Sequence, residues 1–513
     1  MKTNNIKQTI ALVLLAGCTV FNSGCKKFLE TNKQGEYTVD NYPFPGGSGP
    51  YDQFLFGAYN DLRSYDVHGP GFFLATNVRS EDADKGSSPT DGGDNAISMD
   101  FFPVLPNNGF INGMWTGYYS MISKCNNTLL QIETNTSIVA TDLQKDVARA
   151  EARFLRAYAY FNMVRLFGRI PLVDKVISAE NSGFPQVGPG QIYPFIEADL
   201  QYAAVNLPPN WDKKFAGRLT KGAANGLLAK VYITQQKWGQ AMATANLVMT
   251  SGQYDLSTPY SRIFGESGEN SKESVFEVQA TASATVPTDN GVEFIQWQGV
   301  RDGGIWNLGY GFNVPNTVLE SAYEPNDPRK ARTFLYRSTG TTTHRTVYDE
   351  VTPTTWQNPI YNHKVYTNPA FRALYNSRAG RWMNIRILRY ADVVLMYAEA
   401  ANEVGGTANI TAAVNALNSV RARARIGAPA GTLPDITFID QDQLRQAIRH
   451  ERRIELAMEH DRFFDLVRWG VSGTVLPAAG RPNFNANRDN LLPIPQTQID
   501  LSKEPYKLTQ NPI

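Results

Sequence analysis

The sequence predicts a mostly α-helical protein, in which tetratricopeptide-like helix pairs form a scaffold that carries long irregular loops and minor β structure. Three observations support this fold class. Several stretches repeat apolar residues every three or four positions, as an amphipathic helix does. Two of these stretches share the spacing of a tetratricopeptide hairpin. Long segments rich in Gly, Pro, Asn and aromatic residues lie between them and show no such period.

The first residues resemble an export signal. Residues 1–8 carry two lysines and no acidic residue, and residues 9–21 are mostly Ile, Ala, Leu and Val. An apolar run of about 13 residues suits a signal peptide better than a membrane-spanning helix, which needs about 20. We therefore predict that residues 1–24 are a lipoprotein signal peptide.

Cys25 is the residue that we expect to carry the lipid. A bacterial lipoprotein signal ends in a small residue followed by a cysteine that is acylated before cleavage, and NSGC at residues 22–25 fits this pattern. Cys18, in LLAGC, is the alternative, but cleavage there would leave a very short signal. A plain signal peptide with incidental cysteines is a further possibility. If Cys25 is lipidated and Cys18 is removed, Cys125 has no partner for an intramolecular disulfide.

Residues 149–173 form the clearest single helix in the sequence. Phe154, Ala157 and Phe161 recur at spacings of three and four, while arginines occupy the other side. Glycine commonly ends a helix because it adopts a left-handed conformation without strain. We therefore expect a long amphipathic helix that ends at Gly168.

Two segments have the residue spacing of a tetratricopeptide hairpin, in which small residues let antiparallel helices approach closely. In residues 220–256 the offsets of 3, 9, 4 and 3 join Ala229, Tyr232, Ala241, Ala245 and Val248. In residues 389–424 the same offsets join Ala398, Ala401, Ile410, Val414 and Leu417. We expect a few such hairpins rather than a long array. Ordinary amphipathic helix pairs are the alternative, and they would bury the same faces.

The segments between the helices are long and lack helical or strand period. They comprise residues 31–53, 65–113, 257–388 and 471–513. Loops of this length inside a compact domain are usually functional. Since no Ser/Gly-rich linker divides the chain, we expect one domain from residue 25 to residue 513.

Composition and charge limit the classes of ligand and partner that we expect for this protein. The chain has 49 basic and 48 acidic residues, which gives no charge-driven reason to expect nucleic acid as a partner. It also contains 24 Tyr, 26 Phe and 8 Trp, and many of these lie in the Gly- and Asn-rich segments. Aromatic rings in loops are candidates for ligand contact, although packing is the first explanation to consider.

The segment 449–470, which we expect to be one helix, contains the densest group of charges. Glu451 and Glu455 lie on one face and raise the possibility of a glycoside hydrolase, in which two carboxyl groups flank the scissile bond. Arginines crowd the same segment and would keep both carboxylates ionised, which is unsuitable for a general acid. We therefore predict a structural ion-pair network and no catalytic residues.

The sequence gives little support for a metal ion or another cofactor. Its five histidines are dispersed, and His450 lacks the second histidine four residues later that a zinc-protease helix requires. Asp82, Asp84 and Gly86 match part of a calcium loop, but the later ligands do not follow. We expect no metal and no cofactor.

The best candidate site is a carbohydrate-binding surface. Aromatic rings stack on the apolar faces of sugars, and polar side chains bind the hydroxyl groups. Residues 294–313 supply Trp297, Trp306 and Tyr310 among glycines, and residues 76–86 supply Arg79 and Asp82. We predict that these five residues contact the ligand, while ordinary loop packing is the alternative for each of them.

Seven segments resemble signatures of the SusD/RagB family of lipoproteins, and they occur in the family's order. They are CKKFLE (25–30), EARFLRAYAYFNMVRLFGRIPLV (151–173), RYADVVLMYAEAANE (389–403), LNSVRARA (417–424), AIRHERRIELAMEHDRFFDLVRWG (447–470), LLPIP (491–495) and LTQNPI (508–513). The CxxFL start favours Cys25 over Cys18. One departure is the final NPI, where a glycine often follows the proline.

The resemblance implies a tetratricopeptide-like scaffold, an architectural role for the charges of residues 451–470, and a lipid anchor in the outer membrane. It also implies a protein that captures oligosaccharide at the cell surface and delivers it to a SusC-like TonB-dependent transporter, without enzymatic activity. The family's shared motifs contain no ligand-binding residues, so none is transferred to this chain. A membrane-anchored glycoside hydrolase and a capture protein for peptides are the alternatives.

Overall fold

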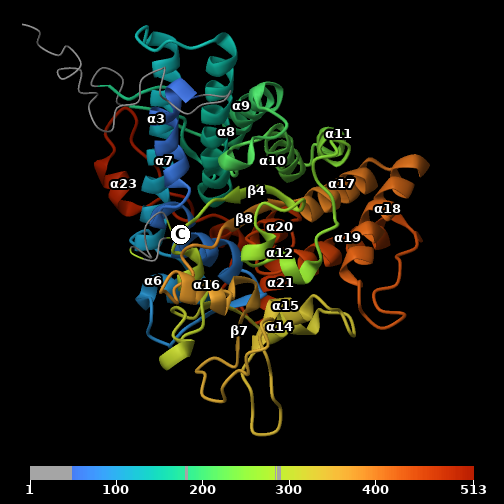
Figure 1. The fold of residues 1–513 in the computed structure, drawn as a ribbon. Coiled ribbons are helices and arrows are strands. Elements are labelled where there is room, and N and C mark those ends of the chain that lie inside the picture. The colour runs from blue at the N-terminus through green and yellow to red at the C-terminus, as the bar shows by residue number, and fades with distance from the viewer. Residues whose placement is uncertain (1–48, 179–182, 283–284, 286–290) are drawn as a thin grey trace, which may run out of the picture.

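The computed structural model describes residues 49–513, except 179–182, 283–284 and 286–290 (Figure 1). The predicted signal peptide 1–24 and both candidate lipid sites, Cys18 and Cys25, lie outside the described residues. Cys125 is a buried free thiol. Burial raises the pKa of this thiol far above its ordinary value.

Long helices form the scaffold, as the sequence predicts. They are α3 (Asp52–Asp61), α7 (Gly109–Thr134), α8 (Asp142–Phe167), α9 (Pro189–Asn206), α10 (Lys221–Thr234), α11 (Trp238–Met249), α17 (Tyr390–Val404), α18 (Thr407–Ala424) and α19 (Gln441–Glu455). Each packs against the next in this series, with α3 against α7 and α11 against α17. In Figure 1, α3 and α7 to α10 lie at the top, and α17 to α19 extend to the right.

Both predicted hairpins are confirmed. Helices α10 and α11 pack together, as do α17 and α18. The small residues of the matched pattern, among them Ala229, Ala245 and Ala401, are completely buried. Because α11 also packs on α17, the two hairpins form one continuous stack although a long stretch of chain separates them.

The ends of the helices follow from local sequence. At the start of α8, Thr141 and Gln144 form a reciprocal capping box, which satisfies two backbone N–H groups. Helix α8 ends at Phe167, and Gly168 follows with a φ of 71°, as the sequence predicts.

The prediction of one continuous helix over residues 449–470 is wrong. Helix α19 ends at Glu455, and α20 (Arg462–Arg468) begins after an irregular turn. Met458 and His460 have φ values of 65° and 81°, which an α-helix cannot contain. Three and four residues beyond Met458 the chain has Asp461 and Arg462, so the apolar spacing is interrupted at this turn.

The long segments between the scaffold helices contain short elements. The helices are α4 (Tyr65–His68), α5 (Pro70–Phe73), α6 (Gly93–Phe101), α12 (Tyr260–Ile263), α13 (Phe294–Gln298), α14 (Thr317–Ser321), α15 (Lys330–Thr333), α16 (Pro369–Leu374), α21 (Ser472–Ala478), α22 (Ala486–Asp489) and α23 (Gln496–Leu501). Single turns are η1 (Gly49–Tyr51), the π-type η2 (Leu74–Val78), η3 (Lys213–Phe215), η4 (Glu266–Gly268), η5 (Gly304–Trp306) and η6 (His363–Val365). The helices α6 and α14 to α16 lie below the scaffold in Figure 1.

The minor β structure consists of antiparallel pairs, each of two strands, within the described part of the chain. They are β1 (Ala83–Gly86) with β5 (Phe312–Pro315), β2 (Ile170–Pro171) with β3 (Gln186–Val187), β4 (Ser274–Val278) with β8 (Ile385–Arg389), and β6 (Phe334–Tyr336) with β7 (Ile360–Asn362). The β1–β5 pair sets Gly86 opposite Phe312 and thereby joins the two loops that the sequence nominates for the site.

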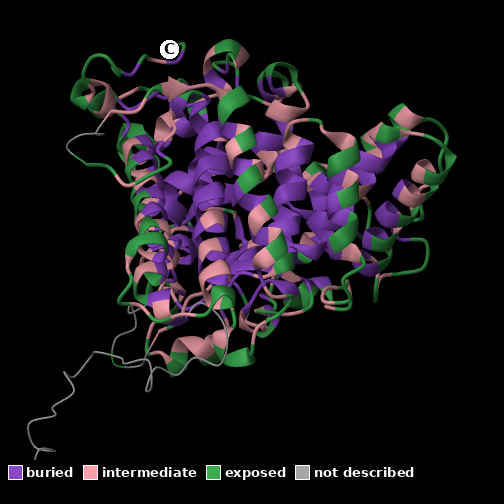
Figure 2. Cartoon of the chain, turned by 90° about the horizontal axis from the view of Figure 1, so that it is seen from above, coloured by how far each residue is buried: buried purple, intermediate pink, exposed green. Residues whose placement is uncertain are grey.

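One large apolar core extends from Leu55 in α3 to Leu508 near the C-terminus. In Figure 2 the buried residues line the inner sides of the long helices, and exposed residues mark their outer faces and the connecting loops. The core therefore ties the helical scaffold to the irregular segments. The single domain from residue 25 to residue 513 stays a prediction.

The predicted ion-pair network is confirmed. Glu451 and Glu455 are completely buried. Three arginines surround Glu455: Arg329 Nη1 at 3.1 Å, Arg389 Nη1 at 3.0 Å and, closer still, Arg423 Nη2. Although burial alone would raise the pKa of Glu455, these arginines bring it well below its ordinary value.

Candidate functional site

The site begins with the close approach of two backbone segments, the end of α13 and residues 308–311. Tyr310 N donates to Gln296 O at 2.9 Å, and Gly311 N donates to Gly299 O at 2.9 Å. A Cβ atom on Gly309 would lie 2.1 Å from Gln296 O, so only glycine permits this approach. The pairing places Trp297 beside Tyr310.

Three aromatic side chains then form a surface, which we call the aromatic platform: Tyr65, Trp297 and Tyr310. The ring centroids of Trp297 and Tyr310 are 5.2 Å apart, and those of Tyr65 and Trp297 are 6.1 Å apart. Tyr65 is 45% exposed and Tyr310 is 42% exposed, with Trp297 half-buried between them. An exposed ring on each side of a tryptophan is a suitable stacking surface for sugar rings.

The platform rests on further aromatic residues. The ring of Phe312, which is buried, lies 5.0 Å from the ring of Trp297, and that of Phe110 lies 6.3 Å away. Phe312 belongs to β5 and Phe110 to the first turn of α7. The indole of Trp297 is thus held from below by both the sheet and the scaffold.

Tyr65 reaches the platform because α4 packs very closely on α7. A Cβ atom on Gly113 would lie 2.6 Å from Asp66 Oδ1, and one on Gly117 would lie 2.7 Å from Asp66 Cβ. Two glycines four residues apart therefore form a flat strip on α7 that admits α4. His68, at the other end of α4, anchors it through hydrogen bonds to the Leu62 carbonyl at 2.6 Å and the Tyr158 hydroxyl at 2.7 Å.

A circuit of polar side chains connects Trp297 to Tyr310 along the edge of the platform. Trp297 Nε1 donates to Glu293 Oε2 at 3.3 Å, and Glu293 Oε1 pairs with Arg381 Nη2 at 3.1 Å. Arg381 Nε donates to Gln296 Oε1 at 2.7 Å, and Gln296 Nε2 donates to the Tyr310 hydroxyl at 3.1 Å. These bonds fix the orientation of both rings.

Trp306 does not join Trp297, contrary to the prediction that both tryptophans form one surface. Its ring packs edge-on against Trp356 at 5.2 Å and lies 6.4 Å from the ring of Tyr366. These residues belong to a separate apolar cluster, in which Trp356 is completely buried. The half-buried Trp306 therefore packs on this second cluster, and we leave it out of the candidate site.

Arg79 and Asp82 also differ from the prediction, because both are buried. Arg79 is 1% exposed, donates to the main-chain carbonyl of Asp489 and stacks on Phe463 at 4.2 Å. Burial lowers the pKa of Arg79 to about 9. Asp82 is 3% exposed and accepts a hydrogen bond from Arg453 Nε at 2.9 Å. Both side chains are bound to interior groups, so they are not exposed to a ligand on the surface.

Tyr65 is the residue that the sequence reasoning missed. It lies in the aperiodic segment 65–113, which the sequence marks as a functional loop, but no local pattern distinguishes it from the other aromatic residues there. The pair Gly113 and Gly117 is the sequence feature that could have pointed to Tyr65, because these glycines let α4 pack closely on α7. It can be interpreted only once that packing is known.

Within the described residues, no group of three or more His, Cys, Asp or Glu side chains is arranged to hold a metal ion. Asp82 and Asp84, the candidate calcium ligands, are instead paired with Arg453 and Arg481. The carboxylates Glu451 and Glu455 have no access to solvent, so they are unable to flank a glycosidic bond.

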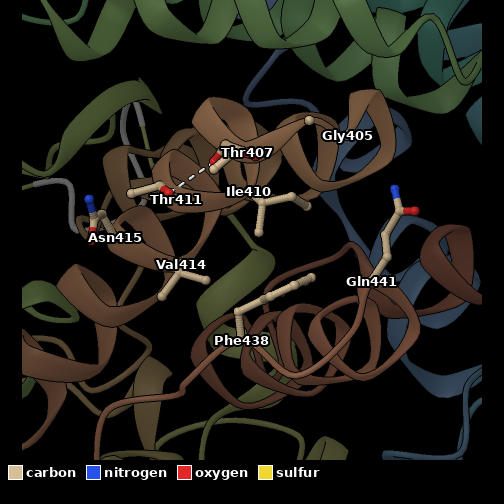
Figure 3. Close-up of a pocket in the computed structure, with 9 residues that line it drawn as sticks. Gly405, Thr407, Ile410, Thr411, Val414, Asn415, Phe438 and Gln441 are labelled. Atoms are coloured by element: carbon tan, nitrogen blue, oxygen red, sulfur yellow. Dashed lines mark hydrogen bonds between the residues drawn. The ribbon is translucent and has the colours of Figure 1, made fainter.

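Two large hollows in the described part of the chain contain none of the three platform side chains. A cleft of about 1180 Å³ lies between α7, the loop at Pro171 and α23, and Trp115, Tyr119 and Tyr506 are among its lining residues. A groove of about 510 Å³ lies beside α18 (Figure 3). Its lining includes the aliphatic side chains of Ile410 and Val414 and the aromatic ring of Phe438. Neither has the exposed pair of rings that flanks Trp297.

In the described part of the chain, no helix combines the length and the apolar run that a membrane span requires.

Comparisons with known proteins agree with this architecture. Residues 312–513 match the model of the SusD family, and residues 81–233 match the model described as starch-binding associating with outer membrane. The chain is 28% identical to SusD-like protein P2 of Formosa agariphila, over 97% of each chain.

Solved structures of similar proteins have the same fold. A laminarin-binding SusD-like protein has a TM-score of 0.74 and 26% identity, covering 91% of this chain and 100% of that one. A SusD homolog from Bacteroides thetaiotaomicron has a TM-score of 0.75 and 24% identity, covering 93% of this chain and 99% of that one. With its matched segments, its helical scaffold and these relatives, the chain belongs to the SusD/RagB family.

Proposed function

We propose that this protein is a lipid-anchored, carbohydrate-binding protein of the outer membrane, which captures oligosaccharide on the aromatic platform and delivers it to a SusC-like TonB-dependent transporter. The observation that carries the proposal is the exposed surface formed by Tyr65, Trp297 and Tyr310. Free aromatic faces are costly to leave in water, and stacking on the C–H face of a sugar removes them from it.

The construction of the site supports capture rather than catalysis. The platform rings are held by glycine contacts and by the Glu293–Arg381–Gln296 circuit, so they are ordered before any ligand arrives. A preorganised surface binds with a smaller entropic cost than a flexible one. The laminarin-binding SusD-like protein, similar in fold and 26% identical, supports a sugar as the ligand.

The hydrolase alternative requires a pair of accessible carboxylates. The pair suggested by the sequence, Glu451 and Glu455, is buried among arginines, and these carboxylates stabilise the packing of α19 against its neighbours. Peptide capture is the second alternative. The platform favours sugar because its exposed aromatic rings suit the flat C–H faces of sugar rings.

The outer-membrane location is supported by the family model described as associating with the outer membrane. The anchor at Cys25 and the transporter are inferred from the family resemblance. C25A should release the protein from the membrane fraction or block its processing, whereas C18A should not. Purification of the full-length protein in mild detergent should recover a much larger barrel protein. Recovery of a free monomer in several detergents, with ligand present, would contradict the transporter part of the proposal.

Calorimetry on the full-length protein tests the capture function directly. The protein is titrated with a panel of oligosaccharides and peptides, and reducing ends are measured in the same samples. Binding of a sugar without release of reducing ends, weakened by W297A, is the expected result. Release of reducing ends that E451Q abolishes would support the hydrolase instead.

A further inference from the structure

The charged side chains closest to the platform neutralise one another. Arg381, which links Gln296 to Glu293, pairs with Glu293 at 3.1 Å. Arg301 pairs with Asp91 and donates to Ser87 Oγ at 2.7 Å. The Cβ atom of Arg301 lies 3.0 Å from the position that a Cβ on Gly311, the residue after Tyr310, would take.

Three further cationic side chains near the platform donate hydrogen bonds to neutral oxygen atoms of the protein. Arg63, close to Tyr65, donates to Asn60 Oδ1 at 2.6 Å, and Arg378 donates to the main-chain carbonyl of Gly304. Lys85 lies over the ring of Phe312 beneath the platform, but it is 5% exposed and its amine donates to three carbonyls. In the described part of the chain, each of these cations near the platform thus has an ion-pair or hydrogen-bond partner.

Acidic side chains contribute a negative electrostatic potential at the platform itself. Asp66 and Glu293 flank Tyr65, whose pKa is raised first by burial and then by these two carboxylates. Asp302 lies in the same loop as Tyr310 and accepts a hydrogen bond from Thr355 at 3.1 Å. An additional anion at Tyr65 would thus meet the carboxylate of Asp66, while the nearby Arg381 is already paired with Glu293.

Carboxylate and sulfate groups are recognised by arginine or lysine side chains that are free to form charge-assisted hydrogen bonds. From the paired arginines and the flanking carboxylates we infer that the platform selects uncharged glycans and rejects polysaccharides that carry uronate or sulfate groups. The inference rests on the proposed capture function and deepens it by naming the class of ligand.

The platform offers a neutral sugar both stacking and hydrogen-bonding partners. Its C–H faces stack on Trp297 and on the two exposed tyrosines, and its hydroxyl groups interact with neutral polar atoms. The Tyr310 hydroxyl accepts a hydrogen bond from Gln296, and a phenol in this state still has its own proton to donate.

Calorimetric titration at two salt concentrations tests the inference. The full-length protein is titrated with neutral hexasaccharides of several linkages, a β-1,3-glucan among them, and with oligogalacturonate and sulfated oligosaccharides of the same length. Measurements at roughly 0.02 M and 0.5 M NaCl separate stacking from ionic binding, because salt screens only the latter. We expect a neutral hexasaccharide to bind with a Kd that changes less than about twofold between the two salts.

A pair of variants tests the role of charge. E293Q keeps the shape of the side chain and an acceptor for Trp297 but frees Arg381, so it should strengthen binding of oligogalacturonate by about fivefold or more at low salt. E403Q is the matched control, since Glu403 pairs with Arg445 on α17 and α19. It should leave the affinity for oligogalacturonate unchanged. If E293Q does not improve that affinity, charge does not set the selectivity and the inference is wrong.

The outcomes separate this inference from the proposed function. If the unmodified protein binds uronate or sulfated chains more tightly than neutral ones, and W297A weakens that binding, the capture function stands and the inference is overturned. If no glycan of either class binds, or if W297A changes no affinity, the proposed function itself fails.

Discussion

The rings of Trp297 and Tyr310 lie 5.2 Å apart between centroids, and their planes are inclined by 79°. They come from segments that meet only because Gly299 and Gly309 allow two backbones to touch. The geometry of this pair, extended by Tyr65 on the other side of Trp297, is the basis of the function that we propose.

The two tryptophans of the same loop should respond differently to truncation. W297A removes the centre of the platform and should weaken glycan binding by roughly 1 to 3 kcal/mol, about 5- to 150-fold, by analogy with the stacking of bases on aromatic side chains. W306A removes packing on Trp356 and should lower the free energy of unfolding by roughly 1 to 3 kcal/mol while changing affinity little.

Calorimetry and thermal melting of both variants measure these effects side by side. A large loss of affinity in W306A together with an unchanged affinity in W297A would reverse our assignment of the two side chains.

Gly309 should be essential to the geometry of the platform. The Cβ atom that G309A adds would lie 2.1 Å from Gln296 O, which is too close for two non-bonded atoms. The two backbone segments must therefore move apart, and the rings of Trp297 and Tyr310 must move apart with them. We expect a loss of affinity of at least about tenfold, which corresponds to about 1.4 kcal/mol. Titration with the best glycan of the panel provides the measurement.

Gly303 supplies the matched control for Gly309. Its φ of −85° suits alanine, and a Cβ there would have no atom within 4 Å. G303A should therefore bind glycan as the unmodified protein does. Equal affinities for G303A and G309A would show that the close approach of the two segments is unimportant for binding.

Glu455 should be critical for stability and irrelevant to ligand binding. E455Q removes the negative charge that three buried arginines share, and breaking a buried ion pair on one side costs about 3 to 5 kcal/mol. Chemical denaturation of E455Q and of D442N, whose side chain is 85% exposed, should separate the two roles. D442N should change stability by about 0.5 kcal/mol or less. A folded E455Q protein of unchanged stability would refute the network's structural role.

His68 should contribute a loss of stability in mild acid. Burial lowers the pKa of His68 from 6.5 to about 4. Between these values the unfolded chain binds a proton that the folded protein excludes, so the free energy of unfolding falls as the pH decreases. The contribution of one such histidine is at most about 1.4 kcal/mol per pH unit.

Denaturant titrations at several pH values from 7.5 to 4.5, on the unmodified protein and on H68Q, measure this effect. H68Q lacks the titrating group, so its stability should depend less steeply on pH in this range. Parallel curves for the two proteins would show that His68 is not responsible for the slope.

Local spacing was sufficient to predict the scaffold. The offsets among Ala229, Tyr232 and Ala241 describe one helix pair, and they hold wherever that pair lies in the fold. Trp297 and Tyr310 were also accessible to sequence reasoning, because they are aromatic residues in a glycine-rich segment that the sequence marks as a functional loop.

Long-range contacts account for the rest of the site. Asp82 is buried because Arg453, far away in the sequence, pairs with it, and the loop sequence contains no sign of that partner. Tyr65 could not be assigned for the same reason, since its position depends on Gly113 and Gly117 of another helix. The break between α19 and α20 depends on left-handed conformations at Met458 and His460, which are uncommon for any residue other than glycine.

A crystal structure of the protein with a bound neutral oligosaccharide tests the central claim most directly. We expect one sugar ring to lie within about 4 Å of the Trp297 indole, with neighbouring units in contact with Tyr65 or Tyr310. An oligosaccharide bound in the cleft near Tyr119, or in the groove beside α18, with the platform unoccupied, would contradict it.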